Sequence, residues 1–167
     1  MQKKLPENVD FLKQVERNAC FEGTWPVSRF ERLTDIIHDS SGEVAARLRF
    51  GISAGTPCLD GAIEAELKLR CERCLEPVTH RIESDFRFGL ITSEDEAAFL
   101  PKEYEPLLVT ESEQSLIELV EDELLLSLPI VAKHDEECSE ILQKHKAKSD
   151  TQHDTYRPFA ALKDLMN

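Results

Sequence analysis

The sequence predicts an α+β domain in which an antiparallel β-meander of four to five strands packs against helices and is followed by a flexible C-terminal tail. Three observations predict this class: long runs of alternating apolar and polar residues between 44 and 88, a capped amphipathic segment over 115–128, and a polar tract over 143–157. The 167 residues, 41% of them hydrophobic, suffice for one core. We expect a single domain over 1–140, a flexible polar tail over 141–157 and a short helical segment over 158–167.

The N-terminal third predicts a short strand followed by a helix. Residues 19–25 favour a strand that meets Pro26. Ser28 and Glu31 match the Ser-x-x-Glu capping box, which predicts a helix that begins at Ser28. Apolar residues at helical spacing continue this helix to near His38.

The central third predicts three consecutive strands of one antiparallel sheet. Every second residue is apolar, so one face should be buried and the other wet. The cysteine turn, from Cys71 to Cys74, falls between the second and third of these strands and should form a hairpin tip. The inward-facing residues are Val44, Ala46, Leu48, Phe50 and Ile52, then Ile63, Ala65, Leu67 and Leu69, then Val78, His80, Ile82, Phe86 and Phe88.

The last third predicts an edge strand over 107–110, after Pro106, and then a helix from Ser115 to Leu128. Ser115 and Glu118 form a second capping box, and Pro129 stops the helix. Its broad apolar arc should pack on the inner face of the sheet. Glu123 falls within that arc, so it should find an arginine or backbone amides.

Cys71 and Cys74 have the spacing of half a tetrahedral zinc site, and His134 and Cys138 could supply the other two ligands. Because 59 residues separate Cys74 from His134, tertiary folding would have to assemble the site. Two alternatives stay open for the cysteine pair: redox chemistry, or an ordinary place in the core. Zinc is the one cofactor that the sequence suggests.

The net charge of −13 is concentrated in residues 111–140, which hold ten acidic side chains and one basic one. Such a surface repels phosphate and attracts basic partners. We expect an acidic face on the helix from Ser115 to Leu128 with an exposed leucine among its carboxylates; the candidate partner-binding residues are Glu118, Glu121, Asp122 and Leu125. The alternative is that the acidic composition only keeps the protein in solution.

The wet face of the sheet provides a competing surface. Its cations outnumber the acids Glu64, Glu66, Glu83 and Asp85, so a local RNA contact is one interpretation and cross-strand salt bridges are the other. No aromatic side chain shares this face, which excludes a base-stacking platform there. The candidate RNA-contact residues are Arg47, Arg49, Lys68, Arg70, Arg81 and Arg87.

Compartment and class follow from what the sequence contains. Five cysteines, only two of them close together, do not form a disulfide scaffold. The N-terminus lacks the apolar core of a signal peptide, and no segment approaches the ~20 apolar residues that cross a bilayer. We expect a cytoplasmic protein with no membrane partner. The sequence has no Gly-rich phosphate loop, His-Glu-x-x-His or Gly-x-Ser-x-Gly motif, so we expect no enzyme.

Four motifs in order resemble those of the bacterial YceD family, the large ribosomal RNA subunit accumulation proteins. They are Cys71-Glu72-Arg73-Cys74-Leu75, then Leu100-Pro101-Lys102-Glu103-Tyr104-Glu105-Pro106, then Val120-Glu121-Asp122-Glu123-Leu124 running into Leu128-Pro129, and finally Pro158-Phe159 with Leu162. The resemblance spans nearly the whole chain. Many relatives carry further cysteines after the Leu-Pro element, where this chain has only His134 and Cys138.

The resemblance implies a non-enzymatic factor for accumulation of the large-subunit (23S) ribosomal RNA, acting in assembly of that subunit. Its partners would be the precursor large subunit, through either its rRNA or a basic ribosomal protein, and not DNA. The alternative function is an acidic, chaperone-like protein that binds a basic ribosomal protein without touching RNA.

Overall fold

The computed structural model describes residues 5–139 and has the predicted α+β class. The chain divides into two compact units, residues 1–133 and 134–167, and the second is described only over 134–139. The predicted tail over 141–157 and the helical segment over 158–167 lie outside the described residues. Within the described part, no helix has the length and apolar character needed to cross a membrane.

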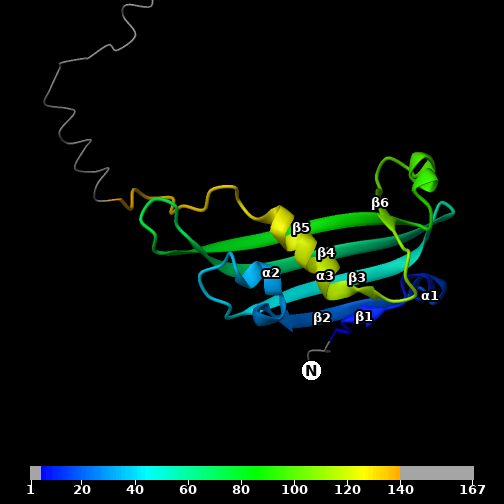
Figure 1. The fold of residues 1–167 in the computed structure, drawn as a ribbon, viewed down its shortest axis with the longest axis horizontal. Coiled ribbons are helices and arrows are strands. Elements are labelled where there is room, and N and C mark those ends of the chain that lie inside the picture. The colour runs from blue at the N-terminus through cyan, green and yellow to red at the C-terminus, as the bar shows by residue number, and fades with distance from the viewer. Residues whose placement is uncertain (1–4, 140–167) are drawn as a thin grey trace, which may run out of the picture. The chain divides into compact units, whose positions relative to one another are not determined.

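The first unit is built on a five-stranded sheet in the order β2-β3-β4-β5-β6 (Figure 1). A separate two-stranded ribbon joins β1 to β7. The strands are β1 (Asn8–Val9), β2 (Cys20–Pro26), β3 (Glu43–Ser53), β4 (Thr56–Arg70), β5 (Pro77–Ile91), β6 (Glu105–Leu108) and β7 (Gln114–Ser115). The helices are α1 (Phe11–Glu16), α2 (Glu31–Thr34) and α3 (Leu116–Ser127), with the 3-10 turns η1 (Val27–Arg29) and η2 (Glu94–Phe99).

The four strands β2 to β5 form the predicted antiparallel meander. Leu48, Leu67 and Phe86, one from each central strand, are all buried, so the predicted register is confirmed. The edge strand differs from the meander, because β6 pairs parallel to β5. The connection through η2 carries the chain back to the start of that pairing, so β6 runs in the direction of β5.

The turn between β3 and β4 is short. Ala54 and Gly55 alone form it, both with positive φ, as a two-residue hairpin turn requires. The strand β4 then runs straight through Pro57 and Gly61. Gly61 lies opposite Phe86, whose ring covers the position that a side chain would occupy, so this glycine makes room for an aromatic ring.

Helix α3 crosses the inner face of the sheet, as predicted (Figure 1). Its residues Leu116, Val120 and Leu124 are fully buried and belong to the same hydrophobic core as the inner residues of β3, β4 and β5. Ser115 caps the helix by accepting a hydrogen bond from the backbone N–H of Glu118 at 3.2 Å, which confirms the second capping box.

The first predicted helix is largely wrong. Ser28 lies in the 3-10 turn η1, and α2 is a single turn that begins after Phe30 without a side-chain cap from its own sequence. The cap comes instead from α3, because the Glu121 carboxylate accepts a hydrogen bond from the backbone N–H of Leu33 at 3.0 Å. A distant carboxylate thus satisfies a free N–H group that the sequence pattern assigned to Ser28.

Glu121 is therefore a structural residue, which corrects its predicted place on an exposed acidic face. It is 5% exposed, and its second oxygen accepts from Arg32 Nε at 2.9 Å. Arg32 also donates to Asp122 at 2.6 Å and to the backbone carbonyl of Glu118 at 3.4 Å. The guanidinium thus joins α2 to a full turn of α3.

Two other residues of α3 differ from expectation. Leu125 was expected to be exposed, but it is half-buried against the core, and Leu126 projects outward instead with 79% exposure. Glu123 was expected to find an arginine or backbone amides, but the arginine that reaches α3, Arg32, binds Glu121 and Asp122. Burial, followed by the nearby carboxylates of Glu105 and Asp122, raises the pKa of Glu123.

We predict that Glu121→Ala lowers the free energy of unfolding by about 2 kcal/mol, because it leaves the Leu33 N–H and the inner side of Arg32 without an acceptor. Glu121→Gln keeps an acceptor but loses the charge, so its free energy of unfolding should lie between those of the wild type and Glu121→Ala. Urea unfolding measures both. The matched control is Glu118→Ala on the exposed side of the same helix, expected within ~0.5 kcal/mol of wild type. Equal midpoints for Glu121→Ala and Glu118→Ala would contradict this role.

We also predict that Glu123→Gln raises the urea midpoint at pH 7. The pKa of this carboxyl is higher in the folded chain than its ordinary value of 4.5, so its ionised form costs stability above the folded pKa. The cost disappears as the pH falls below the unfolded value, where both states are protonated. The gain from Glu123→Gln should therefore shrink between pH 7 and pH 4. A gain independent of pH would show that the carboxylate charge is not the cause.

Candidate metal centre and charged surfaces

The turn between β4 and β5 is a closed knuckle at the hairpin tip, as predicted. The backbone N–H of Cys71 donates to the carbonyl of Glu76, and that of Leu75 donates to the carbonyl of Cys71, both at 2.9 Å. Leu75 has a φ of +68°, which turns the chain back sharply after Cys74. These bonds fix the backbone on either side of the two thiols.

The two cysteines of the knuckle differ in how deeply they are buried. Cys71 is buried and Cys74 is half-buried. The backbone N–H of Arg73 points at Cys71 Sγ, 3.4 Å away. A backbone donor directed at sulfur favours the thiolate, which is the form that binds metal ions.

The chain returns to this knuckle after α3. The backbone N–H of Glu72 donates to the carbonyl of Ala132 at 2.9 Å. His134 follows two residues later, and Cys138 four residues after that. In the sequence, β5, η2, β6, β7 and α3 all lie between the two halves of the predicted ligand set.

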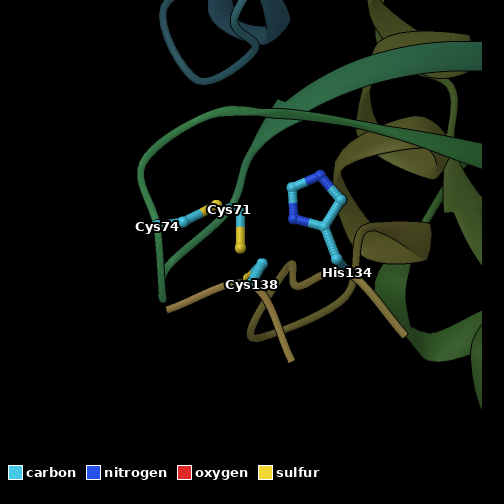
Figure 2. A group of neighbouring side chains, drawn as sticks. All are labelled: Cys71, Cys74, His134 and Cys138. Atoms are coloured by element: carbon cyan, nitrogen blue, oxygen red, sulfur yellow. The ribbon is translucent and has the colours of Figure 1, made fainter. Parts of the chain in front are cut away.

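The four predicted ligands form a group in the structure. The ligand atoms of Cys71, Cys74, His134 and Cys138 all lie within 4.8 Å of one another, and Figure 2 shows their side chains gathered together. In a tetrahedral site with ~2.3 Å bonds, ligand atoms are about 3.8 Å apart, so a shift of roughly 1 Å suffices for coordination. Three thiols and one imidazole are a zinc-type ligand set. This group could therefore hold a metal ion.

The predicted acidic helix face is smaller than expected. Glu118 and Asp122 are exposed, but Glu121 and Leu125 are not. The two exposed acids line a groove of about 510 Å³ between α2 and α3. The other lining residues are Arg29, Glu31, Arg32, Ile117 and Glu121. Arg32 forms ion pairs with Glu121 and Asp122. The other two carboxylates of this groove, Glu31 and Glu118, have no ion pair within the described residues.

The wet face of the sheet is not the net positive surface that the sequence suggested. The strands extend further than the sequence pattern indicated, and three more acids lie on this face: Glu22 on β2, Glu43 on β3 and Asp60 on β4. With these included, the acids on this face at least equal the cations. The ion pairs are Arg47 with Glu22, Lys68 with Asp39, Arg81 with Glu64 and Glu83, and Arg87 with Asp60. Cross-strand salt bridges therefore explain most of these residues.

Of the six predicted RNA-contact residues, Arg49 and Arg70 have no ion pair with any residue in 5–139. Sequence reasoning missed Glu22 and Asp60 because nothing local marks them; only the register sets Glu22 opposite Arg47, and Asp60 opposite Arg49 and Arg87. It also missed Ala132, whose backbone carbonyl marks where the chain meets the knuckle. A carbonyl carries no signal in a sequence.

Comparisons with known proteins agree on one family. Residues 59–166 match the family described as large ribosomal RNA subunit accumulation protein YceD. The chain is 31% identical over 171 aligned positions to the protein of that name from Haemophilus influenzae, covering 99% of this chain and 98% of that protein. No solved structure matches the chain.

Proposed function

The chain belongs to the YceD family of large ribosomal RNA subunit accumulation proteins, and from this premise we propose that it is a non-enzymatic cytoplasmic factor that promotes accumulation of 23S rRNA during large-subunit assembly. The near full-length similarity to a relative of that name carries the proposal. The motifs that first suggested the family fall on the knuckle, on the segment before and within β6, and on α3.

The charges of the described residues favour a basic protein over RNA as the direct partner. Neighbouring carboxylates neutralise most cations of the sheet face, so few remain for phosphate. The acids Glu31 and Glu118 stand exposed along the groove between α2 and α3. A surface of this sign is complementary to a ribosomal protein and repels rRNA.

Direct RNA contact remains the second candidate, and Arg49 and Arg70 are the residues that favour it. Both are exposed on the outer sheet face, and no described carboxylate pairs with either guanidinium. Two arginines can contribute two phosphate contacts, which makes binding only weakly dependent on salt.

The Cys3His group supports the further proposal that Cys71, Cys74, His134 and Cys138 bind one zinc ion. Four protein ligands leave no open coordination position, which is the arrangement of a structural site. When bound, zinc would supply cross-links between the hairpin tip and the residues that follow α3. The thiol-directed N–H of Arg73 and the fixed knuckle backbone are what this chain contributes to the site.

We predict that protein purified without chelators contains about one equivalent of zinc per chain. Cys74→Ser and Cys138→Ser should each remove most of it, and a chelator should lower Tm of the wild type. Elemental analysis and thermal unfolding measure these changes. The matched control is Cys20→Ser, because Cys20 is an exposed thiol on β2 outside the group. Less than about a tenth of an equivalent in the wild type would leave the cysteines without a metal role.

We predict that cells lacking this protein have a lowered ratio of large-subunit to small-subunit rRNA, and that the wild-type gene restores it. The double variant Glu118→Lys and Asp122→Asn, which reduces the charge of the acidic face but keeps an acceptor for Arg32, should restore it poorly because a basic partner is attracted less. Quantitative analysis of total rRNA measures the ratio.

The matched comparison is Arg49→Glu with Arg70→Glu on the sheet face. If this variant fails while the acidic-face variant succeeds, the working surface is the sheet and the partner is RNA. A normal ratio in the deletion strain would refute the proposed function itself. Urea midpoints of both variants exclude loss of folding as the cause.

A further inference from the structure

Residues 92–105, which we call the Phe99 lobe, form a connection held firmly at both ends. At its start, the Glu96 carboxylate accepts from the backbone N–H and the hydroxyl of Thr92 at 2.9 and 3.0 Å. Leu100 packs so closely on Gly89 that a side-chain carbon there would lie 2.6 Å from it. At its end, Tyr104 is buried, and Arg87 donates to its hydroxyl at 3.1 Å with the guanidinium 4.8 Å from the ring centre.

This anchored lobe nevertheless exposes a large aromatic side chain. Phe99 is 85% exposed, whereas every other phenylalanine in the described part of the chain is buried or half-buried. Because Leu100 and Tyr104 already anchor the lobe, Phe99 is not needed to hold it in place. An exposed aromatic ring on a fixed backbone is a typical anchor of an interface, since little conformational freedom is lost when it is covered.

The surroundings of Phe99 are acidic. Glu94 and Asp95 precede it in the same 3-10 turn η2, and both are exposed and have no hydrogen bond or ion pair within residues 5–139. Glu96 lies one 3-10 turn before Phe99, on the same side of η2. Lys102 is the only cation of the lobe. A ring with exposed carboxylates on the same short turn attracts cations and repels phosphate.

We infer that the Phe99 lobe is a docking surface for a basic polypeptide segment, with an arginine or lysine side chain stacked on the Phe99 ring and neighbouring cations facing Glu94 and Asp95. The inference rests on the proposed function and names the chemistry of its partner. The stacking contact requires the face of an aromatic ring, and the carboxylates select the sign of the partner.

The test uses the full-length protein and a fluorescein-labelled peptide of ten Arg-Gly repeats, with binding followed by fluorescence anisotropy at low and physiological salt. Phe99→Ala should weaken binding by about three- to thirtyfold. Phe99→Leu should weaken it similarly, because leucine keeps apolar area but has no π-system. Glu94→Gln with Asp95→Gln should weaken binding mainly at low salt.

Two matched controls separate the lobe from general acidity. Glu111→Gln with Glu113→Gln removes the same charge from exposed acids outside the lobe, and should leave the affinity within about twofold of wild type. Leu126→Ala truncates a comparably exposed apolar side chain on α3, and should have no effect. Urea midpoints verify that all variants are folded.

Three results would overturn the inference. The first is wild-type affinity for the peptide in Phe99→Ala, and the second is wild-type affinity in Phe99→Leu. The third is that a labelled 20-nucleotide RNA binds more tightly than the peptide and that this RNA binding depends on Phe99. Failure here is distinguishable from failure of the proposed function, because the binding assay uses purified components while the rRNA ratio is measured in cells. If the protein binds the peptide through Phe99 but the deletion strain has a normal ratio of large-subunit to small-subunit rRNA, the docking surface stands and the proposed function fails.

Discussion

The Glu121 carboxylate holds the layer of helices together on the sheet. It is buried, it caps α2 through the Leu33 N–H, and it accepts from Arg32 Nε, so one side chain connects two helices that are far apart in the sequence. A buried carboxylate is tolerated only when its acceptors are satisfied, and here both oxygens are. The position of α3 over the sheet, and with it the path of the chain after Leu128, depends on this arrangement.

That path leads to the hairpin tip. The strands β4 and β5 extend beyond the pairing of β3, whose register with β4 ends at Val44 and Ala65, and the knuckle lies at the end of this extension. The bond from Glu72 to Ala132 brings the chain leaving α3 to the same point. Helix position and hairpin length together bring Ala132 to the knuckle, and His134 and Cys138 follow it closely in the sequence.

Some charged side chains form ion pairs within the fold, and others remain unpaired at the surface. Strand pairing and the α2–α3 contact neutralise Arg32, Arg47, Arg81 and Arg87, because each lies near an acid across a ladder or a helix interface. An excess of acid in the sequence therefore appears at the surface as unpaired carboxylate, on α3 and in η2. These unpaired carboxylates are the basis of the proposed preference for basic partners.

The sequence by itself determined the meander, its register, the hairpin tip at Cys71 and the helix capped by Ser115, because period-two alternation and the Ser115 cap are local signals that tertiary packing did not override there. At Ser28 the same capping pattern was overridden, because α2 takes its cap from Glu121 instead. The sequence also suggested Cys71, Cys74, His134 and Cys138 as a ligand group, because thiols and an imidazole are recognisable as metal-ligand types before folding. Only the tertiary structure decided that Glu121 is buried, that β6 runs parallel to β5, and that Glu22 and Asp60 neutralise the sheet face. Each depends on which distant residue lies opposite, and that information is absent from any window of sequence.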